Sequence, residues 1–199
     1  MDESVSIRLF LAINLPDAVR RGLEAAVTSS RAANDDVRWA RAESLHLTLV
    51  FLGERPAAQV EAISQAAGGA CAGLVPFSLT VAEPGCFPSP ARPRVLWVGI
   101  AEGRESLIAL QRAVLGALAR AGLADQVDRF SPHLTLGRVR DSVAPAARAA
   151  LAQKWTALAL PALPLAPVRA IYLMRSELGP GGARYSVLRT LPLNGALIR

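Results

Sequence analysis

Residues 45–52 carry the sequence Leu-His-Leu-Thr-Leu-Val-Phe-Leu, in which apolar and polar residues alternate before the run becomes wholly apolar. Such a run, ended by Gly53, is typical of a β-strand with one face in the core. Residues two apart point to the same side of a strand, so His46 and Thr48 are expected on one face, about 7 Å apart. The residues expected on the other face, toward the core, are Leu45, Leu47, Leu49 and Phe51.

The same tetrapeptide, His-Leu-Thr-Leu, returns at residues 133–136. The chain contains only two histidines, and each opens one copy, so chance is a poor explanation of the repeat. By the same alternation His133 and Thr135 face away from the core. If a pseudo-twofold axis relates the two strands, both polar faces line one central cleft.

Hydrophobic periodicity elsewhere predicts an α+β fold. Strands are expected at residues 7–15, 45–52, 77–81, 95–100, 132–139, 168–174 and 185–191. Helices are expected at residues 17–33, 56–72, 105–121 and 145–155, with a proline-rich loop at 84–93 and a hairpin turn at 179–182. Because no linker divides the chain, we expect a single domain over residues 1–199. It would have two pseudo-symmetric lobes, each an antiparallel sheet with helices on its outer face.

The composition limits the choice of partners and compartments. Hydrophobic residues make up 52% of the chain, the net charge is +6, and Lys154 is the only lysine. An arginine surplus favours phosphate-bearing partners, because guanidinium binds phosphate at two points. A GC-rich genome would produce the same usage, so charge alone does not decide. Cys71 and Cys86 form no disulfide framework or zinc site and are expected to be reduced thiols without a role.

The chain also lacks the marks of export or membrane insertion. The acidic start at Asp2 and Glu3 and the short apolar run after it do not resemble a signal peptide. The most hydrophobic stretch, residues 157–168, is interrupted by three prolines and is far shorter than the roughly 20 residues that span a bilayer. We therefore expect a soluble cytoplasmic protein, with no membrane partner.

Two imidazoles and two hydroxyls facing one cleft suit the cleavage of a phosphodiester. One neutral imidazole can accept a proton from water while the other, protonated, gives a proton to the leaving oxygen. The hydroxyls of Thr48 and Thr135 can donate to the non-bridging phosphate oxygens. The scheme needs no metal or other cofactor, and two histidines without neighbouring carboxylates make a weak metal site.

The paired His-x-Thr-x motifs, about ninety residues apart, resemble those of the 2H phosphoesterases. The amino-acid sequence of the motifs is similar to that of the RNA 2′,3′-cyclic phosphodiesterases, also called 2′-5′ RNA ligases. The similarity extends to residues 8–13, 45–54, 93–99, 132–138 and 182–188, and so to nearly the whole chain.

This resemblance implies the substrate and the role of each residue. The reaction would be hydrolysis of an RNA 2′,3′-cyclic phosphate end to a 2′-phosphomonoester. His46 would be the proton donor to the leaving 3′ oxygen and His133 the proton acceptor from water, with Thr48 and Thr135 holding the phosphate. Position in the sequence alone cannot assign donor and acceptor.

Arg138 is a further candidate for phosphate binding. Strict alternation points it away from Thr135, so this role requires Gly137 to kink the strand. An ordinary surface arginine is the alternative.

Two other functions use the same residues. The histidines could run the reverse reaction and join a cyclic phosphate to a 5′-hydroxyl, although bulk water favours hydrolysis. A module that binds RNA ends or nucleotides without turnover would not need two proton-transfer groups. The expected partner is RNA with a cyclic phosphate end, or a cyclic nucleotide. A monomer is expected, although no sequence feature fixes the oligomeric state.

Overall fold

The computed structural model describes residues 5–30, 36–124, 130–179 and 182–195. Within these residues the strands are β1 (Ser6–Asn14), β2 (Val37–Trp39), β3 (His46–Pro56), β4 (Phe77–Phe87), β5 (Val95–Glu102), β6 (Leu134–Val139), β7 (Leu163–Val168), β8 (Ala170–Gly179) and β9 (Gly182–Pro192). The α-helices are α1 (Asp17–Ser30), α2 (Val60–Ala72), α3 (Arg104–Arg120) and α4 (Pro145–Thr156), and short 3-10 turns occupy Ala42–Ser44 and Ala57–Gln59.

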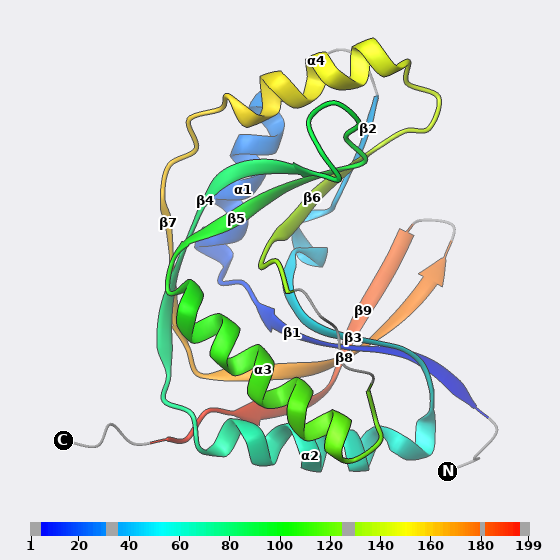
Figure 1. Cartoon of the computed structure of the whole chain (residues 1–199), viewed down its shortest axis with the longest axis vertical. Coiled ribbons are helices and arrows are strands. Elements are labelled where there is room, and N and C mark those ends of the chain that lie inside the picture. Colours follow the sequence, from blue (N-terminus) through cyan, green and yellow to red (C-terminus); the bar gives the residue numbers. More distant parts are fainter. Residues whose placement is uncertain (1–4, 31–35, 125–129, 180–181, 196–199) are drawn as a thin grey trace.

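The strands form two antiparallel sheets that confirm the predicted α+β architecture. One sheet has the order β3-β1-β8-β9 and the other the order β2-β6-β5-β4-β7. In Figure 1 the first sheet lies in the lower part of the molecule with α2 and α3, and the second in the upper part with α1 and α4. We call these two units the His46 lobe and the His133 lobe.

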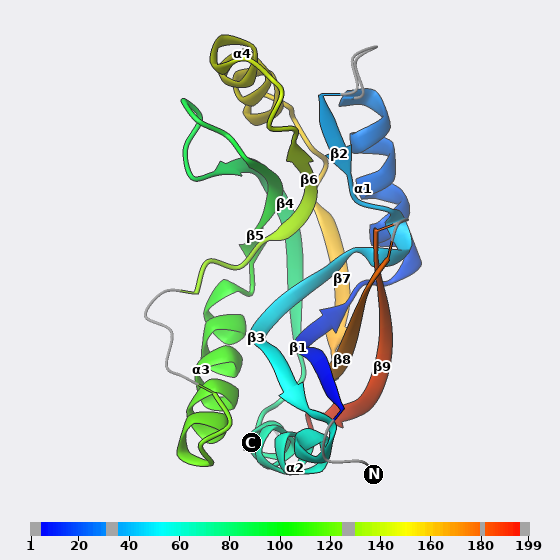
Figure 2. The same cartoon turned by 90° about the vertical axis from the view of Figure 1, so that its right-hand side faces the viewer.

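The lobes exchange a helix with each other. Helix α1 follows β1 of the His46 lobe but packs beside β7 of the His133 lobe, and α3 follows β5 but packs against α2 and β3. Figure 2 shows both crossings, with α1 alongside β2 and α3 below β5. The lobes are therefore related by pseudo-symmetry, but neither consists of one continuous half of the chain.

Strand β1 is buried on both faces, which explains why its sequence is almost continuously apolar. Leu9, Leu11 and Ile13 belong to the main core. Phe10 and Ala12 point the other way and form a small cluster with Met174 of β8. The cleft side of the His46 lobe is thus backed by a packed apolar layer.

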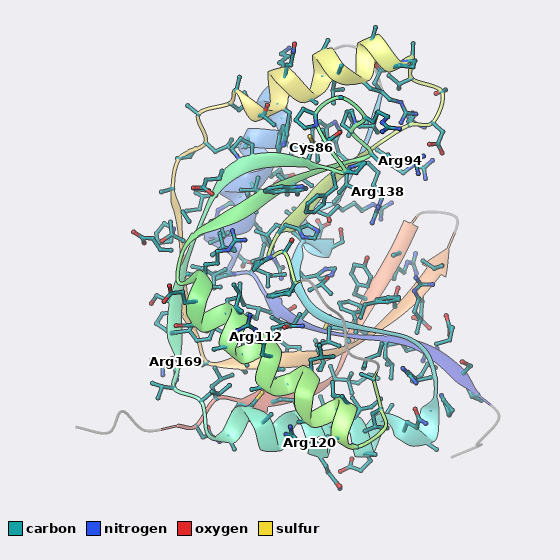
Figure 3. All side chains as sticks on the ribbon, in the orientation of Figure 1. Cys86, Arg94, Arg112, Arg120, Arg138 and Arg169 are labelled. Carbon is teal, nitrogen blue, oxygen red and sulfur yellow. The ribbon has the colours of Figure 1, made fainter. Side chains whose placement is uncertain are left out.

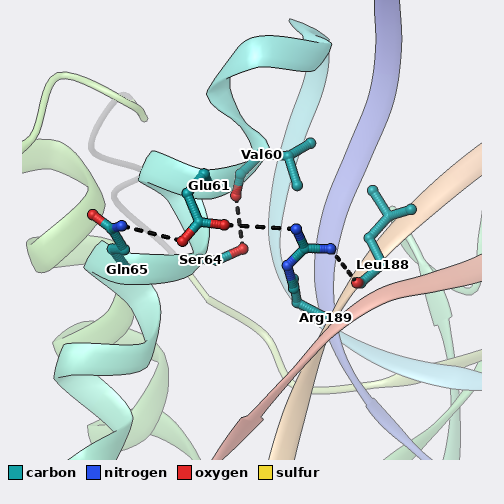
Figure 4. A network of polar contacts seen from close by, with 6 residues as sticks. All are labelled: Val60, Glu61, Ser64, Gln65, Leu188 and Arg189. Carbon is teal, nitrogen blue, oxygen red and sulfur yellow. Dashed lines mark hydrogen bonds and ion pairs between the residues drawn. The ribbon is translucent and has the colours of Figure 1, made fainter. Parts of the chain in front are cut away.

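Polar contacts also attach α2 to the last strand. Figure 4 shows Glu61 of α2 in an ion pair with Arg189 of β9, at 3.6 Å, and accepting a hydrogen bond from Gln65 at 3.1 Å. Arg189 donates to the Leu188 carbonyl at 2.8 Å, and Ser64 donates to the Val60 carbonyl at 2.7 Å. Both charged partners are largely exposed, so the ion pair contributes about 0–1 kcal/mol and chiefly orients the helix.

Several predicted boundaries are wrong. Pro56 ends β3 instead of opening a helix, and α2 begins at Val60. Strand β4 continues to Phe87 and takes in the first part of the expected loop at 84–93. Pro84 is accommodated there because the β4–β5 register shifts between Ala82 and Pro84.

Two strands escaped prediction, and both lie at a sheet edge. β2 spans three residues, and β7 carries Pro164 and Pro167, which an edge strand tolerates. Residues 31–33 of the predicted first helix and the tip of the predicted hairpin at 180–181 lie outside the described residues. Across the described ranges, no helix combines the length and apolar character that crossing a membrane requires.

Candidate active site

Strand β3 presents the first His-Leu-Thr-Leu copy to the space between the sheets. Leu47 and Leu49 are buried in the core, while His46 and Thr48 are only partly buried and line a pocket between the lobes. The alternation predicted for these four residues is what the structure contains.

The alternation then breaks at Leu49. Ala12 of β1 pairs with Thr48 and Leu11 with Val50, so Leu49 is an extra residue, a β-bulge. Leu49 and Val50 are consequently both buried, and Phe51 turns to the same side as His46 and Thr48. The prediction that Phe51 faces the core is wrong: its side chain is 56% exposed and lines the pocket.

Strand β6 contains the same bulge at the equivalent place. Trp97 of β5 pairs with Thr135 and Leu96 with Gly137, which leaves Leu136 as the extra residue. The bulge turns Arg138 toward the pocket, beside Thr135. Strict alternation would have pointed Arg138 away, and the device that reverses it is the extra residue Leu136.

Gly137 is not what turns Arg138 toward the pocket; its lack of a side chain makes room for β2. A Cβ at this position would lie 2.6 Å from a methyl carbon of Val37 and 2.9 Å from the Trp39 ring. The missing side chain therefore lets β2 pack closely against β6. Trp39 in turn packs on Trp155 of α4, with ring centroids 5.7 Å apart.

The pocket has a volume of about 490 Å³, in the usual range for small-ligand sites. It brings together all five residues singled out from the sequence, which are His46, Thr48, His133, Thr135 and Arg138. In the described part of the chain, no hydrogen bond is recorded for either threonine hydroxyl, so both can serve a ligand.

Each histidine is held in the same way. Nδ1 of His46 lies 2.7 Å from the Ser44 carbonyl, and Nδ1 of His133 lies 2.7 Å from the Ser131 carbonyl. A carbonyl can only accept, so Nδ1 carries the hydrogen in both rings. The nitrogen available to a ligand is therefore Nε2, which can accept a proton when the ring is neutral and donate one when it is charged.

Aromatic rings support both histidines. His46 lies 4.8 Å from the Phe10 ring and meets Tyr185 edge-on at 4.9 Å. His133 meets Phe87 edge-on at 5.0 Å, and Trp97 lies 6.2 Å away. Burial lowers the pKa of His46 below its usual value of 6.5, and the bond to Ser44 offsets only part of that effect.

Three further arginines line the pocket, and no described Asp or Glu does. Arg8 stacks over the Phe51 ring at 4.9 Å from its centroid, while Arg38 and Arg41 come from β2 and the turn after it. Sequence reasoning missed these three residues and Tyr185. The excess of arginine was a signal of phosphate binding, but it could not say which arginines converge.

Cys71 and Cys86 lie apart from this pocket. Both thiols are buried and free, and burial raises the pKa of Cys71 to about 11. Among the described residues, no three His, Cys, Asp or Glu side chains cluster closely enough to hold a metal ion.

Comparison with known proteins shows that the chain is similar to RNA 2′,3′-cyclic phosphodiesterases over nearly its whole length. The family described as the 2′-5′ RNA ligase superfamily matches residues 15–180. The RNA 2′,3′-cyclic phosphodiesterase of Methanothermobacter thermautotrophicus is 30% identical over 189 residues, covering 95% of this chain and 100% of the relative. That of Thermus thermophilus is 34% identical over 200 residues, covering 95% of this chain and 91% of the relative.

Solved structures give the same picture. The crystal structure of E. coli LigT complexed with 3′-AMP superposes with a TM-score of 0.74 at 29% identity, covering 95% of this chain and 99% of LigT. LigT has also been solved in complex with phosphate, with a TM-score of 0.71.

Proposed function

This chain belongs to the 2′-5′ RNA ligase superfamily of 2H phosphoesterases, and we propose that it hydrolyses RNA 2′,3′-cyclic phosphate ends to 2′-phosphomonoesters. Curated relatives that align over nearly its whole length are RNA 2′,3′-cyclic phosphodiesterases, which supports an enzyme of that kind. The structure of LigT with 3′-AMP supports a nucleotide phosphate as the ligand of the pocket.

The observation that carries the proposal is the matched pair of histidines. Both rings are fixed as the Nδ1–H form by a carbonyl two residues upstream, and both line one pocket. A binding site needs neither two basic nitrogens nor a fixed tautomer for each. Acid–base catalysis of one displacement needs both.

The reaction proceeds by attack of water on phosphorus. As the water oxygen bonds to phosphorus, His133 accepts its proton at Nε2. The bond from phosphorus to the 3′ oxygen breaks, and His46 gives its Nε2 proton to that oxygen. The products are a 3′-hydroxyl and a 2′-phosphomonoester, and each histidine ends in the state in which the other began.

Thr48, Thr135 and Arg138 stabilise the phosphate during this step. Negative charge grows on the non-bridging oxygens, and hydroxyl and guanidinium donors already in place are the groups that stabilise it. Phe51 offers an exposed aromatic surface beside them, on which the terminal base can stack.

The assignment of roles within the pair has a consequence for protonation. A lowered pKa favours neutral His46 in the free protein, whereas a proton donor must be charged. The anionic cyclic phosphate therefore has to raise the His46 pKa when it binds, because an adjacent negative charge favours imidazolium. If His46 were the acceptor, its low pKa would already suit it.

Incubation of metal-free protein with adenosine 2′,3′-cyclic phosphate and with a cyclic-phosphate RNA tests the proposal. We expect both to be opened, with the 2′-phosphate as product. A 3′-phosphate product, or tight binding without turnover, would contradict it. Including an RNA with a 5′-hydroxyl measures ligation in the same reaction. A monomeric state and a cytoplasmic location stay predictions.

A further inference from the structure

We propose that the edge strand β2 and the residues that follow it hold a second phosphate subsite, in which Arg38 and Arg41 bind the phosphate on the 5′ side of the terminal nucleotide. This inference rests on the proposed function and adds the direction in which the RNA leaves the pocket. We call the candidate subsite, made of Arg38 and Arg41, the β2 arginine cluster.

The first support is the placement of like charges. Arg38 lies directly opposite Arg138 in the β2–β6 register, and both line the pocket. Like charges in directly opposite positions destabilise a sheet. No ion pair with a described carboxylate is recorded for Arg38, Arg41 or Arg138, so nothing in these ranges offsets the repulsion. A bound polyanion would.

The second support is that the backbone of β2 is firmly held. The Ala40 amide donates to the Leu136 carbonyl at 2.7 Å, and the Arg140 amide donates to the Asp36 carbonyl at 2.9 Å. Trp39 packs into the space left by Gly137. Arg38 and Arg41 are exposed side chains on this fixed edge strand, which suits a site for an outside ligand.

The third support is spacing. The bulge leaves Thr135 and Arg138 two strand positions apart, or about 7 Å, and β2 lies about 4.8 Å beyond β6. The β2 arginine cluster is thus next to the site of chemistry, and Arg38 starts one strand farther from Thr135 than Arg138 does. It is placed for the neighbouring phosphate of the same strand.

A second hollow beside the pocket suits RNA less well, because its two arginines are matched by two glutamates. This smaller hollow, of about 190 Å³, adjoins the pocket at Arg8, Ser176 and Leu178, and it carries the carboxylates of Glu54 and Glu177. Arg175 in this hollow is paired with Glu177 at 2.9 Å. Carboxylates repel a phosphate chain, whereas no described acid lines the pocket on the β2 side.

Three substrates test the proposal: adenosine 2′,3′-cyclic phosphate, the same compound with a 5′-phosphate, and the dinucleotide ApA ending in a cyclic phosphate. We expect kcat/KM to rise about tenfold when the 5′-phosphate or the second nucleotide is added. In Arg38→Gln and Arg41→Gln, the ratio of kcat/KM for the longer substrates to that for the short one should fall by a similar factor.

The control is Arg112→Gln, an exposed arginine on α3 that Figure 3 shows far from Arg138. It should leave the ratio unchanged, while Arg38→Lys should keep part of the gain. The two glutamine variants could also lose the rise in kcat/KM with the dinucleotide but keep it with the 5′-phosphate. That result would still support the subsite and identify its ligand as a phosphodiester.

Two results would overturn the inference. One is equal wild-type kcat/KM for all three substrates, and the other is an equal loss on short and long substrates in Arg38→Gln. Failure of the wild-type protein to open even the short substrate is a separate result, which rejects the proposed function itself.

Discussion

The two histidine sites share one scaffold and differ in what surrounds it. Phe10 and Trp97 each precede their histidine by 36 residues, and each histidine has its Nδ1 on a carbonyl two residues upstream. Five residues after the histidine, however, the His46 lobe presents Phe51 and the His133 lobe presents Arg138. Repetition supplies the same tautomer twice, and the difference between acid and base has to come from neighbours outside the repeat.

In the proposed reaction the two histidines act as partners in one step, so removing either should have the largest effect. We expect His46→Ala and His133→Ala each to lower turnover by about two to four orders of magnitude, with unfolding transitions like that of the wild type. The double variant should be barely slower than either single one, because acid and base act in one displacement.

Asparagine provides a matched control, since its side-chain amide can still donate to the Ser44 or Ser131 carbonyl but cannot transfer the proton. His46→Asn and His133→Asn should be as slow as the alanine variants. Near-native turnover in any of these single variants would reject the paired acid–base scheme.

The fifth position offers the next test. Arg138→Gln should lower kcat/KM by about a hundredfold, since a charged donor to the phosphate is lost. Phe51→Ala should cost about tenfold and mainly raise KM, as expected for a lost stacking surface. A larger loss of kcat/KM at Phe51 than at Arg138 would mean that stacking in the His46 lobe contributes more than phosphate binding in the His133 lobe.

The lobes also differ in the burial of His46, and the pH dependence of kcat/KM measures the effect of that burial. If His46 is the donor, kcat/KM falls as pH rises through its pKa, and burial moves this alkaline limb to lower pH. Tyr185→Ser lets water reach the ring, raises the His46 pKa toward 6.5, and should move the alkaline limb to higher pH. A shift of the acidic limb instead would make His46 the acceptor.

Phe87→Ser is the control in the other lobe and should leave the limb that depends on His46 in place. Because the chain has only two histidines, a proton NMR titration of the free protein yields just two imidazole curves. One of them should have its midpoint below 6.5 and should move upward in Tyr185→Ser. The limbs of the rate profile belong to the coupled pair, so the titration makes the individual assignment.

The smallest effect should follow the removal of metals. Each lobe contributes an imidazole and a hydroxyl to the pocket, and neither contributes a described carboxylate. We expect turnover to be unchanged in excess chelator. Loss of activity that one particular divalent metal restores would show that the two sites cooperate through a ligand they share.

The sequence correctly predicted which face of the strand His46 and Thr48 occupy, because their placement depends only on local alternation, which a strand fixes. It failed three residues later, at Phe51, because the bulge arises from how β3 pairs with β1. Arg138 posed the same problem, and only the β5 register resolves it. The register between strands that are distant in sequence cannot be predicted from either tetrapeptide alone.

The rest of the pocket shows the same limit more strongly. Tyr185 reaches His46 from the last strand, and Arg38 comes from a three-residue edge strand with no periodic signal of its own. The prolines of β7 argued against a strand because the sequence does not show which strand is at an edge. The helix exchange was equally hidden, since α1 and α3 have ordinary amphipathic patterns whichever sheet they cover.

The two bulges make these motifs tolerant of a change in length at one position, in a way that substitution would not reveal. Replacing Leu136 by another apolar residue keeps the count of residues, so Arg138 still reaches the pocket. Deleting that one codon would remove only the extra residue, because Thr135, Gly137 and Arg138 could still pair with Trp97, Leu96 and Val95, now in a regular ladder that keeps Arg138 at the pocket. Evolution of this fold can therefore change or lose the residue at the bulge, whereas losing a single residue where the ladder is regular would exchange the inside of the strand for its outside.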